Sequence, residues 1–102
     1  MYLVHAHLDL PPGEQLPLDI RTLVRSAITA DDGIEHVAVH PRRPRELTLG
    51  LYLLSDTLGE AEQRAVDVCG RLIREVPQLT SARLIGAGVP VQSLAFAPLP
   101  MD

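Results

Sequence analysis

The chain has 102 residues, a formal net charge of −4 and 46% hydrophobic residues. That length corresponds to one ordinary domain, and the composition is too apolar for a disordered chain. Because binding to a phosphate backbone requires a basic surface, the acidic balance argues against nucleic acid as a partner. The sequence contains neither lysine nor asparagine, whose codons are AT-rich, and this indicates a GC-rich, bacterial genome.

Segments that would direct the chain to another compartment are not visible in the sequence. Cys69 is the only cysteine, so no intrachain disulfide and no thiolate metal cluster is expected. No apolar leader follows Met1, and no stretch is long enough to span a membrane. We therefore expect a cytoplasmic protein without membrane contact. It would be a single domain over residues 1–102, with a core of residues 2–88 and an apolar tail of residues 89–102.

The first third of the chain predicts a strand followed by a helix. Residues 2–10 alternate between two sets of side chains, as a strand does, and prolines then end the run. Residues 18–30 carry apolar side chains at the spacing of one buried helix face, from Ile20 to Ile28. Asp31, Asp32 and Gly33 predict a turn at the helix end.

The rest of the chain predicts two strands, a helix and a further strand, over residues 34–40, 45–55, 58–76 and 80–87. Residues 41–44 form a short connection, which favours an antiparallel hairpin. Thr57 and Glu60 have the spacing of a capping box at the start of the second helix, and Pro77 ends that helix. Residues 91–97 could form one more strand.

This β-α-β-β-α-β order over about residues 2–88 resembles the ferredoxin-like α+β sandwich. The resemblance implies a four-stranded antiparallel sheet of order 4-1-3-2, with both helices on one face. Many small proteins of this architecture resemble the dimeric α+β barrels. In those proteins the open sheet faces of two subunits pack together and enclose a cavity.

The helix-free face of this sheet has an unusual composition. Alternating leucines of residues 45–55 must face the helices, so the side chains of opposite parity form the other face. That set contains no arginine or glutamate and is too polar for a dry core; such mixed faces suit a ligand pocket or a subunit interface. Its members are Leu3, His5, His7, Asp9, His36, Ala38, His40, Thr48, Gly50, Tyr52 and Leu54.

All four histidines fall on this face and make it the candidate site. His5 or His7 and His36 or His40 could lean over the gap left by Gly50, with Tyr52 beside it. The candidate ligand-binding residues are therefore His5, His7, His36, His40, Gly50 and Tyr52. Three interpretations stay open. A metal site would use His5 and His7, although metals need three or four converging ligands. A catalytic site would use His5, His7, His36 or Tyr52. Alternatively, the histidines form hydrogen bonds within a dimer interface or lie half-exposed.

These interpretations correspond to three functions. The one we favour is a non-enzymatic, homodimeric binding or accessory module that holds a small organic ligand or a partner protein on the helix-free face. We expect its role in bacterial specialised metabolism and no cofactor. The second is a small barrel enzyme, such as an isomerase, a cyclase or a cofactor-free oxygenase. The third is a histidine-based metal-binding protein. In each, the tail could cross to the partner subunit.

Two loops add weaker signals. Residues 9–16 resemble the D-x-P-G-x-L turn of ACT regulatory domains, which meets a ligand at a subunit interface. Extra residues follow Gly13 in this chain, and a plain proline-rich turn is the alternative.

Arg42, Arg43 and Arg45 lie close together at the hairpin, where guanidinium groups suit phosphate or carboxylate. The alternative is a solvated loop. Cys69 is expected in the core, and residues 86–88 do not form a phosphate loop because no helix follows them.

Overall fold

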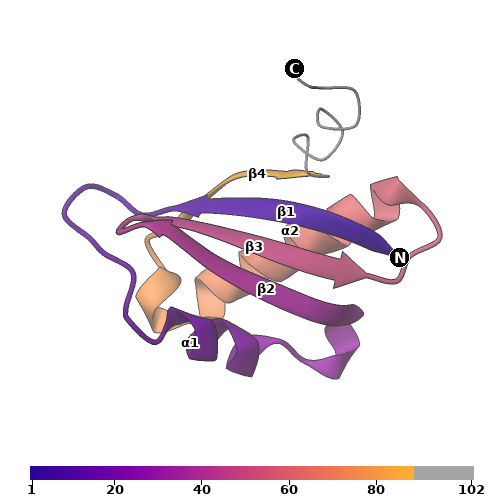
Figure 1. Ribbon diagram of the computed structural model, residues 1–102, viewed down its shortest axis with the longest axis horizontal. Coiled ribbons are helices and arrows are strands. Elements are labelled where there is room, and N and C mark those ends of the chain that lie inside the picture. The colour runs from indigo at the N-terminus through magenta and orange to yellow at the C-terminus, as the bar shows by residue number, and fades with distance from the viewer. Residues whose placement is uncertain (89–102) are drawn as a thin grey trace, which may run out of the picture.

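A computed structural model describes residues 1–88 of the chain, which form a four-stranded antiparallel sheet and two α-helices (Figure 1). The predicted α+β class is thereby confirmed. The tail of residues 89–102, with the strand predicted over 91–97, lies outside the described residues. None of the helices in residues 1–88 is long and apolar enough to cross a membrane.

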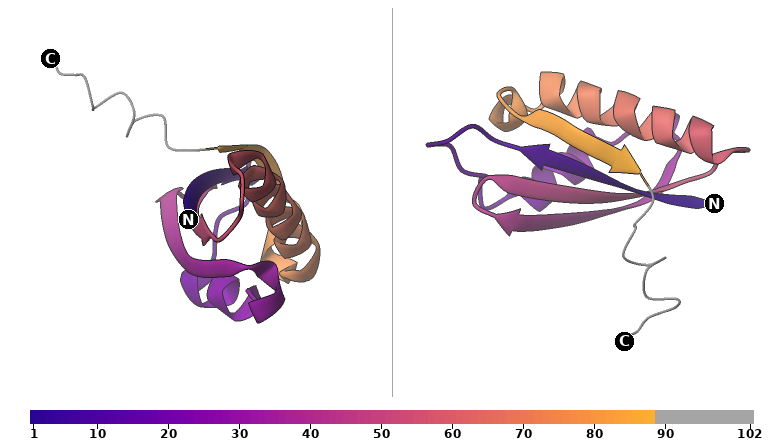
Figure 2. Two further views of the ribbon diagram at one scale, coloured as in Figure 1. Left: turned by 90° about the vertical axis from the view of Figure 1, so that its right-hand side faces the viewer. Right: turned by 90° about the horizontal axis from the view of Figure 1, so that it is seen from above.

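The elements follow one another as β1, α1, β2, β3, α2 and β4. Their bounds are Tyr2–Asp9, Ile20–Ala27, Ile34–Arg43, Glu46–Leu53, Leu58–Glu75 and Arg83–Gly88, with short 3-10 turns at Ala30–Asp32 and Pro77–Leu79. The sheet has the order β2-β3-β1-β4, so β1 and β3 are central and β2 and β4 are edges. Both helices cover the same face of a curved sheet, α1 against β2 and α2 against β1 and β4 (Figure 2).

Aliphatic side chains fill the space between the sheet and the helices. The leucines of β3 alternate as predicted and are at most 1% exposed, and they are Leu47, Leu49, Leu51 and Leu53. Opposite them, α2 contributes Cys69, which is fully buried, so its predicted place in the core is confirmed. Burial raises the pKa of the Cys69 thiol to about 12, which keeps the thiol protonated and unreactive.

Helix α1 is shorter than the sequence predicted, because local hydrogen bonds compete with it at its C-terminal end. Ile28 already has an extended backbone. The Thr29 amide donates a 2.7 Å hydrogen bond to the Asp32 carboxylate, which starts a separate 3-10 turn. Gly33 then reverses the chain with a φ of 70°, a left-handed conformation that favours glycine.

The predicted antiparallel hairpin is confirmed, but its connection is shorter than the predicted residues 41–44. Strand β2 continues through Pro41 to Arg43, and only Pro44 and Arg45 separate it from β3. Pro41 is accommodated because β2 is an edge strand, and the register shifts between Pro41 and Arg43. As a result Arg43 is the direct partner of Glu46, a pairing that the predicted loop concealed.

Side-chain hydrogen bonds stabilise the start of α2 and join its later part to the end of α1. The Thr57 hydroxyl accepts a 3.1 Å hydrogen bond from the Glu60 amide, which is one half of the predicted capping box; within residues 1–88 the reciprocal bond is not formed. Further along α2, Arg71 donates to the Ala27 carbonyl at 2.9 Å and to the Asp32 carboxylate. This arginine therefore ties the end of α1 and the following turn to α2.

Candidate functional site

The strand register arranges the helix-free face in four rows that run across the sheet. We name them the aromatic, glycine, threonine and charged rows. Their members, in that order, are His36-Tyr52-Leu3, Ala38-Gly50-His5-Gly88, His40-Thr48-His7-Gly86 and Arg43-Glu46-Asp9-Arg83. All six residues predicted as ligand-binding thus lie on one face, in three adjacent rows. The register itself could not be read from the sequence.

The gap predicted over Gly50 is narrow and is bordered by side chains of β1 and β2. A Cβ atom placed on Gly50 would make ordinary van der Waals contacts, at 3.5 Å from Ala38 Cβ, 3.5 Å from Leu3 Cδ1 and 3.7 Å from His5 Cδ2. Gly50 is accordingly buried. Only His5 is level with it, since His36 and His40 belong to the rows on either side. The face is therefore flat at its centre rather than hollow.

In the aromatic row the rings of His36 and Tyr52 lie against each other. Their centroids are 5.5 Å apart and the planes are tilted by 53°. His36 is exposed and Tyr52 is half-buried. No hydrogen bond joins the two side chains among residues 1–88, so the contact is one of ring packing.

In the threonine row a hydrogen bond explains a buried polar residue. Thr48 is 4% exposed, and its hydroxyl lies 3.1 Å from His7 Nδ1. A buried hydroxyl without a partner would destabilise the fold, so His7 satisfies Thr48 and Thr48 in turn orients the His7 ring. The outer side of His7 stays exposed.

His5 is the histidine whose surroundings change its protonation. Its ring meets that of His7 edge-on, with the centroids 6.4 Å apart. Partial burial, and then the neighbouring charges of His7, His40 and Arg42, lower the pKa of His5. The imidazole of His5 is therefore neutral at physiological pH, with one nitrogen as donor and the other as acceptor.

We expect this depressed pKa to make the fold less stable in mild acid. The unfolded chain binds a proton at His5 near pH 6.5, whereas the folded chain binds it only at lower pH. The free energy of unfolding should therefore fall as the pH drops through about 6.5. The part of it that His5 contributes should become constant below the pKa of His5 in the folded chain. An NMR titration of His5 ring protons should give a pKa below 6.5, and His5→Gln should flatten the pH dependence of the urea midpoint. A pKa at or above 6.5 would contradict this prediction.

The charged row corrects the prediction that this face lacks arginine and glutamate. It lies at the hairpin end of the sheet, where Arg43 meets Glu46 at 3.8 Å and Arg83 meets Asp9 at 3.9 Å. Each acid thus has a basic partner, although Asp9 and Glu46 are themselves direct neighbours. Glu46 lies in the predicted strand with the parity of Thr48 but is missing from the predicted face, whereas Arg43 falls in the predicted loop.

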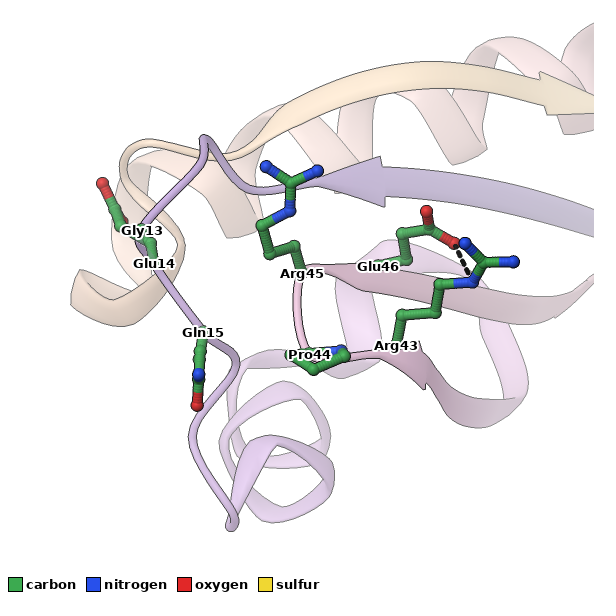
Figure 3. Close-up of a pocket in the computed structure, with 7 residues that line it drawn as sticks. All are labelled: Gly13, Glu14, Gln15, Arg43, Pro44, Arg45 and Glu46. Carbon is green, nitrogen blue, oxygen red and sulfur yellow. Dashed lines mark ion pairs between the residues drawn. The ribbon is translucent and has the colours of Figure 1, made fainter.

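Cavities occur at the margins of the sheet. Three cavities are lined partly by residues of the helix-free face, and a fourth lies between α2 and the turn at Ala30–Asp32; the glycine row lines none of these four. One, of about 350 Å³, lies between the β2–β3 turn and the loop after β1 (Figure 3). Another, of about 260 Å³, lies beside His36 at the β2 edge.

Within residues 1–88, no three histidine, cysteine or carboxylate side chains converge as a metal site would require. His5 and His7 are adjacent in space but have no third ligand in that part of the chain. Comparisons of the chain with protein-family models, with curated proteins and with solved structures found no match.

Proposed function

We propose that this chain is a homodimeric binding or accessory module of ferredoxin-like architecture, and that its helix-free face packs against a second copy. One observation carries the proposal. The aromatic, glycine and threonine rows contain no aspartate, glutamate, arginine or lysine, although they cover most of a sheet face that the helices leave open. A face meant only for solvent normally carries interspersed charges.

The rest of the face supports the same interpretation. Leu3, Ala38 and Tyr52 supply apolar surface. The charged row then forms one margin, as the polar rim of a protein interface does. Because Leu3 and His5 lie close to Gly50, the centre is flat, which suits a second flat face.

The size of the face is adequate for a modest dimer. Strand β1 has eight residues and the sheet has four strands, which gives a projected face of roughly 26 Å by 19 Å at the usual strand spacings, or about 500 Å². The accessible area exceeds this projection because side chains protrude. Each partner buries ~800 Å² in an interface of standard size, so the proposed dimer would have a comparatively small interface.

We propose binding rather than catalysis. A barrel enzyme would need an enclosed cavity with positioned acid and base groups, whereas Leu3, His5 and Ala38 surround Gly50 closely. A small ligand would contact the histidines and Tyr52 only where the two packed faces leave space between them. The cytoplasmic location, the bacterial origin and the link to specialised metabolism stay predictions from the sequence.

Sedimentation equilibrium of the full chain at neutral pH tests the proposal. We expect a mass of twice the 11.1 kDa of the chain, with dissociation on dilution. A single species of 11.1 kDa up to millimolar concentration would overturn the proposal.

A further inference from the structure

The cavity at the hairpin turn is held open by the backbone rather than by chance packing of side chains. The Leu10 amide donates to the Arg45 carbonyl at 2.8 Å, and the Leu16 amide donates to the Pro44 carbonyl at 2.7 Å. Residues 11–15 are therefore tied to the β2–β3 turn at both ends and arch beside it (Figure 3). A backbone frame that is already in place reduces the ordering cost of binding, so only side chains such as Arg43 have to move.

The arch itself is stiff. The Glu14 amide donates to the Pro11 carbonyl at 3.2 Å, and Gly13 has a φ of 91°. This is the pattern of a type II turn, with proline at its second position and glycine at its third. Two consecutive prolines restrict the backbone further.

The charges around this cavity favour an anion. Within residues 1–88, Arg45 has no carboxylate within ion-pair distance, although its side chain is partly buried. Arg43 meets Glu46 only at 3.8 Å, near the limit of an ion pair. The other acid of the lining, Glu14, accepts a 2.5 Å hydrogen bond from the Ser81 hydroxyl and projects away from both arginines (Figure 3).

We propose that this cavity binds a small organic anion through a phosphate or carboxylate group. Arg45 is the principal ligand, and Arg43 joins it by turning from Glu46 toward the anion. Guanidinium groups form planar, two-pronged hydrogen bonds with both kinds of oxygen anion. The volume of about 350 Å³ lies at the lower end of the range for small-molecule sites. The site lies at the end of the sheet and shares Arg43 and Glu46 with the charged row, whereas its principal ligand Arg45 lies outside the four rows.

Glu46 opposes anion binding in this cavity. Its carboxylate competes with the anion for Arg43 and also repels it. Replacing Glu46 by glutamine should therefore tighten anion binding, whereas a cavity that bound apolar ligands would not respond in this way. Arg45→Gln removes the principal ligand and should weaken binding by about tenfold or more, as expected for hydrogen bonds to charged groups.

Amide chemical-shift titrations of the full chain at constant ionic strength test the site, with inorganic pyrophosphate and succinate as separate probes. We expect saturable shifts confined to residues 13–15 and 43–46. The probe that binds with the higher affinity shows whether the site prefers phosphate or carboxylate. Arg21→Gln is the matched control, since Arg21 is exposed on α1 and lines none of the described cavities; its affinity should equal the wild type. Failure of both probes to saturate, an equal loss in Arg21→Gln, or an unchanged affinity in Glu46→Gln would each overturn the proposal.

Discussion

Ala38→Asp is expected to convert the dimer into a folded monomer. Ala38 lies in the glycine row, between uncharged neighbours, and its side chain is only partly buried within one subunit. An isologous interface would bury two such carboxylates, one from each copy. Each unpaired buried charge costs about 3–5 kcal/mol, so the dimer should weaken by more than about a thousandfold. Sedimentation equilibrium measures this loss directly.

The control for this variant adds the same charge elsewhere. Thr22 is exposed on α1, on the side of the molecule away from the helix-free face, and Thr22→Asp should leave the dimer unchanged. Far-ultraviolet circular dichroism should show that both variants keep the fold. If Ala38→Asp is folded and associates as tightly as the wild type, the helix-free face is not the interface.

Leu51→Ala should remove a large part of the stability of the fold. Leu51 is fully buried on the central strand β3, where it pairs with Val4 and Val37. Truncating a buried leucine costs about 2–5 kcal/mol, from lost burial and from the cavity left behind. The total free energy of unfolding of such a domain is about 5–15 kcal/mol. We therefore expect a pronounced fall in the urea midpoint.

This measurement is best made in the Ala38→Asp background, because dissociation of a dimer would otherwise add to the free energy of unfolding. Leu18→Ala serves as the matched control: Leu18 is fully exposed, and its truncation should change stability by at most about 0.5 kcal/mol. Equal effects of the two leucine variants would show that the described core is wrong.

The α+β class and the two faces of the sheet could be predicted because they depend on local patterns. Alternation with a period of two separates the buried leucines of β3 from Thr48, Gly50 and Tyr52 on the other side. The spacing of apolar residues likewise predicted both helices, and Thr57 and Pro77 mark the limits of α2.

What could not be predicted depends on pairing between distant strands. The sequence gives no measure of register, so it could not show that Gly50 faces His5 rather than His7. Nor could it show that Leu3 borders the glycine, which depends on the rotamer of a residue on another strand. Pro41 suggested a loop because proline usually ends a strand, and only its edge position allows β2 to continue.

The anion site was partly visible in the sequence. The arginines at the hairpin indicated phosphate or carboxylate binding, and the prolines after β1 indicated a turn. Their meeting around one cavity results from the two backbone hydrogen bonds that join Leu10 and Leu16 to the hairpin turn. Such tertiary contacts have no local sequence signal.

The central claim is that the helix-free face packs against its own copy. An isotope-filtered NOE experiment on a mixture of labelled and unlabelled chains tests it most directly, because it detects only contacts between subunits. We predict intermolecular NOEs from the side chains of Leu3, Ala38 and Tyr52 to residues of the same face. Intermolecular NOEs from the helices alone, or none at millimolar concentration, would contradict it.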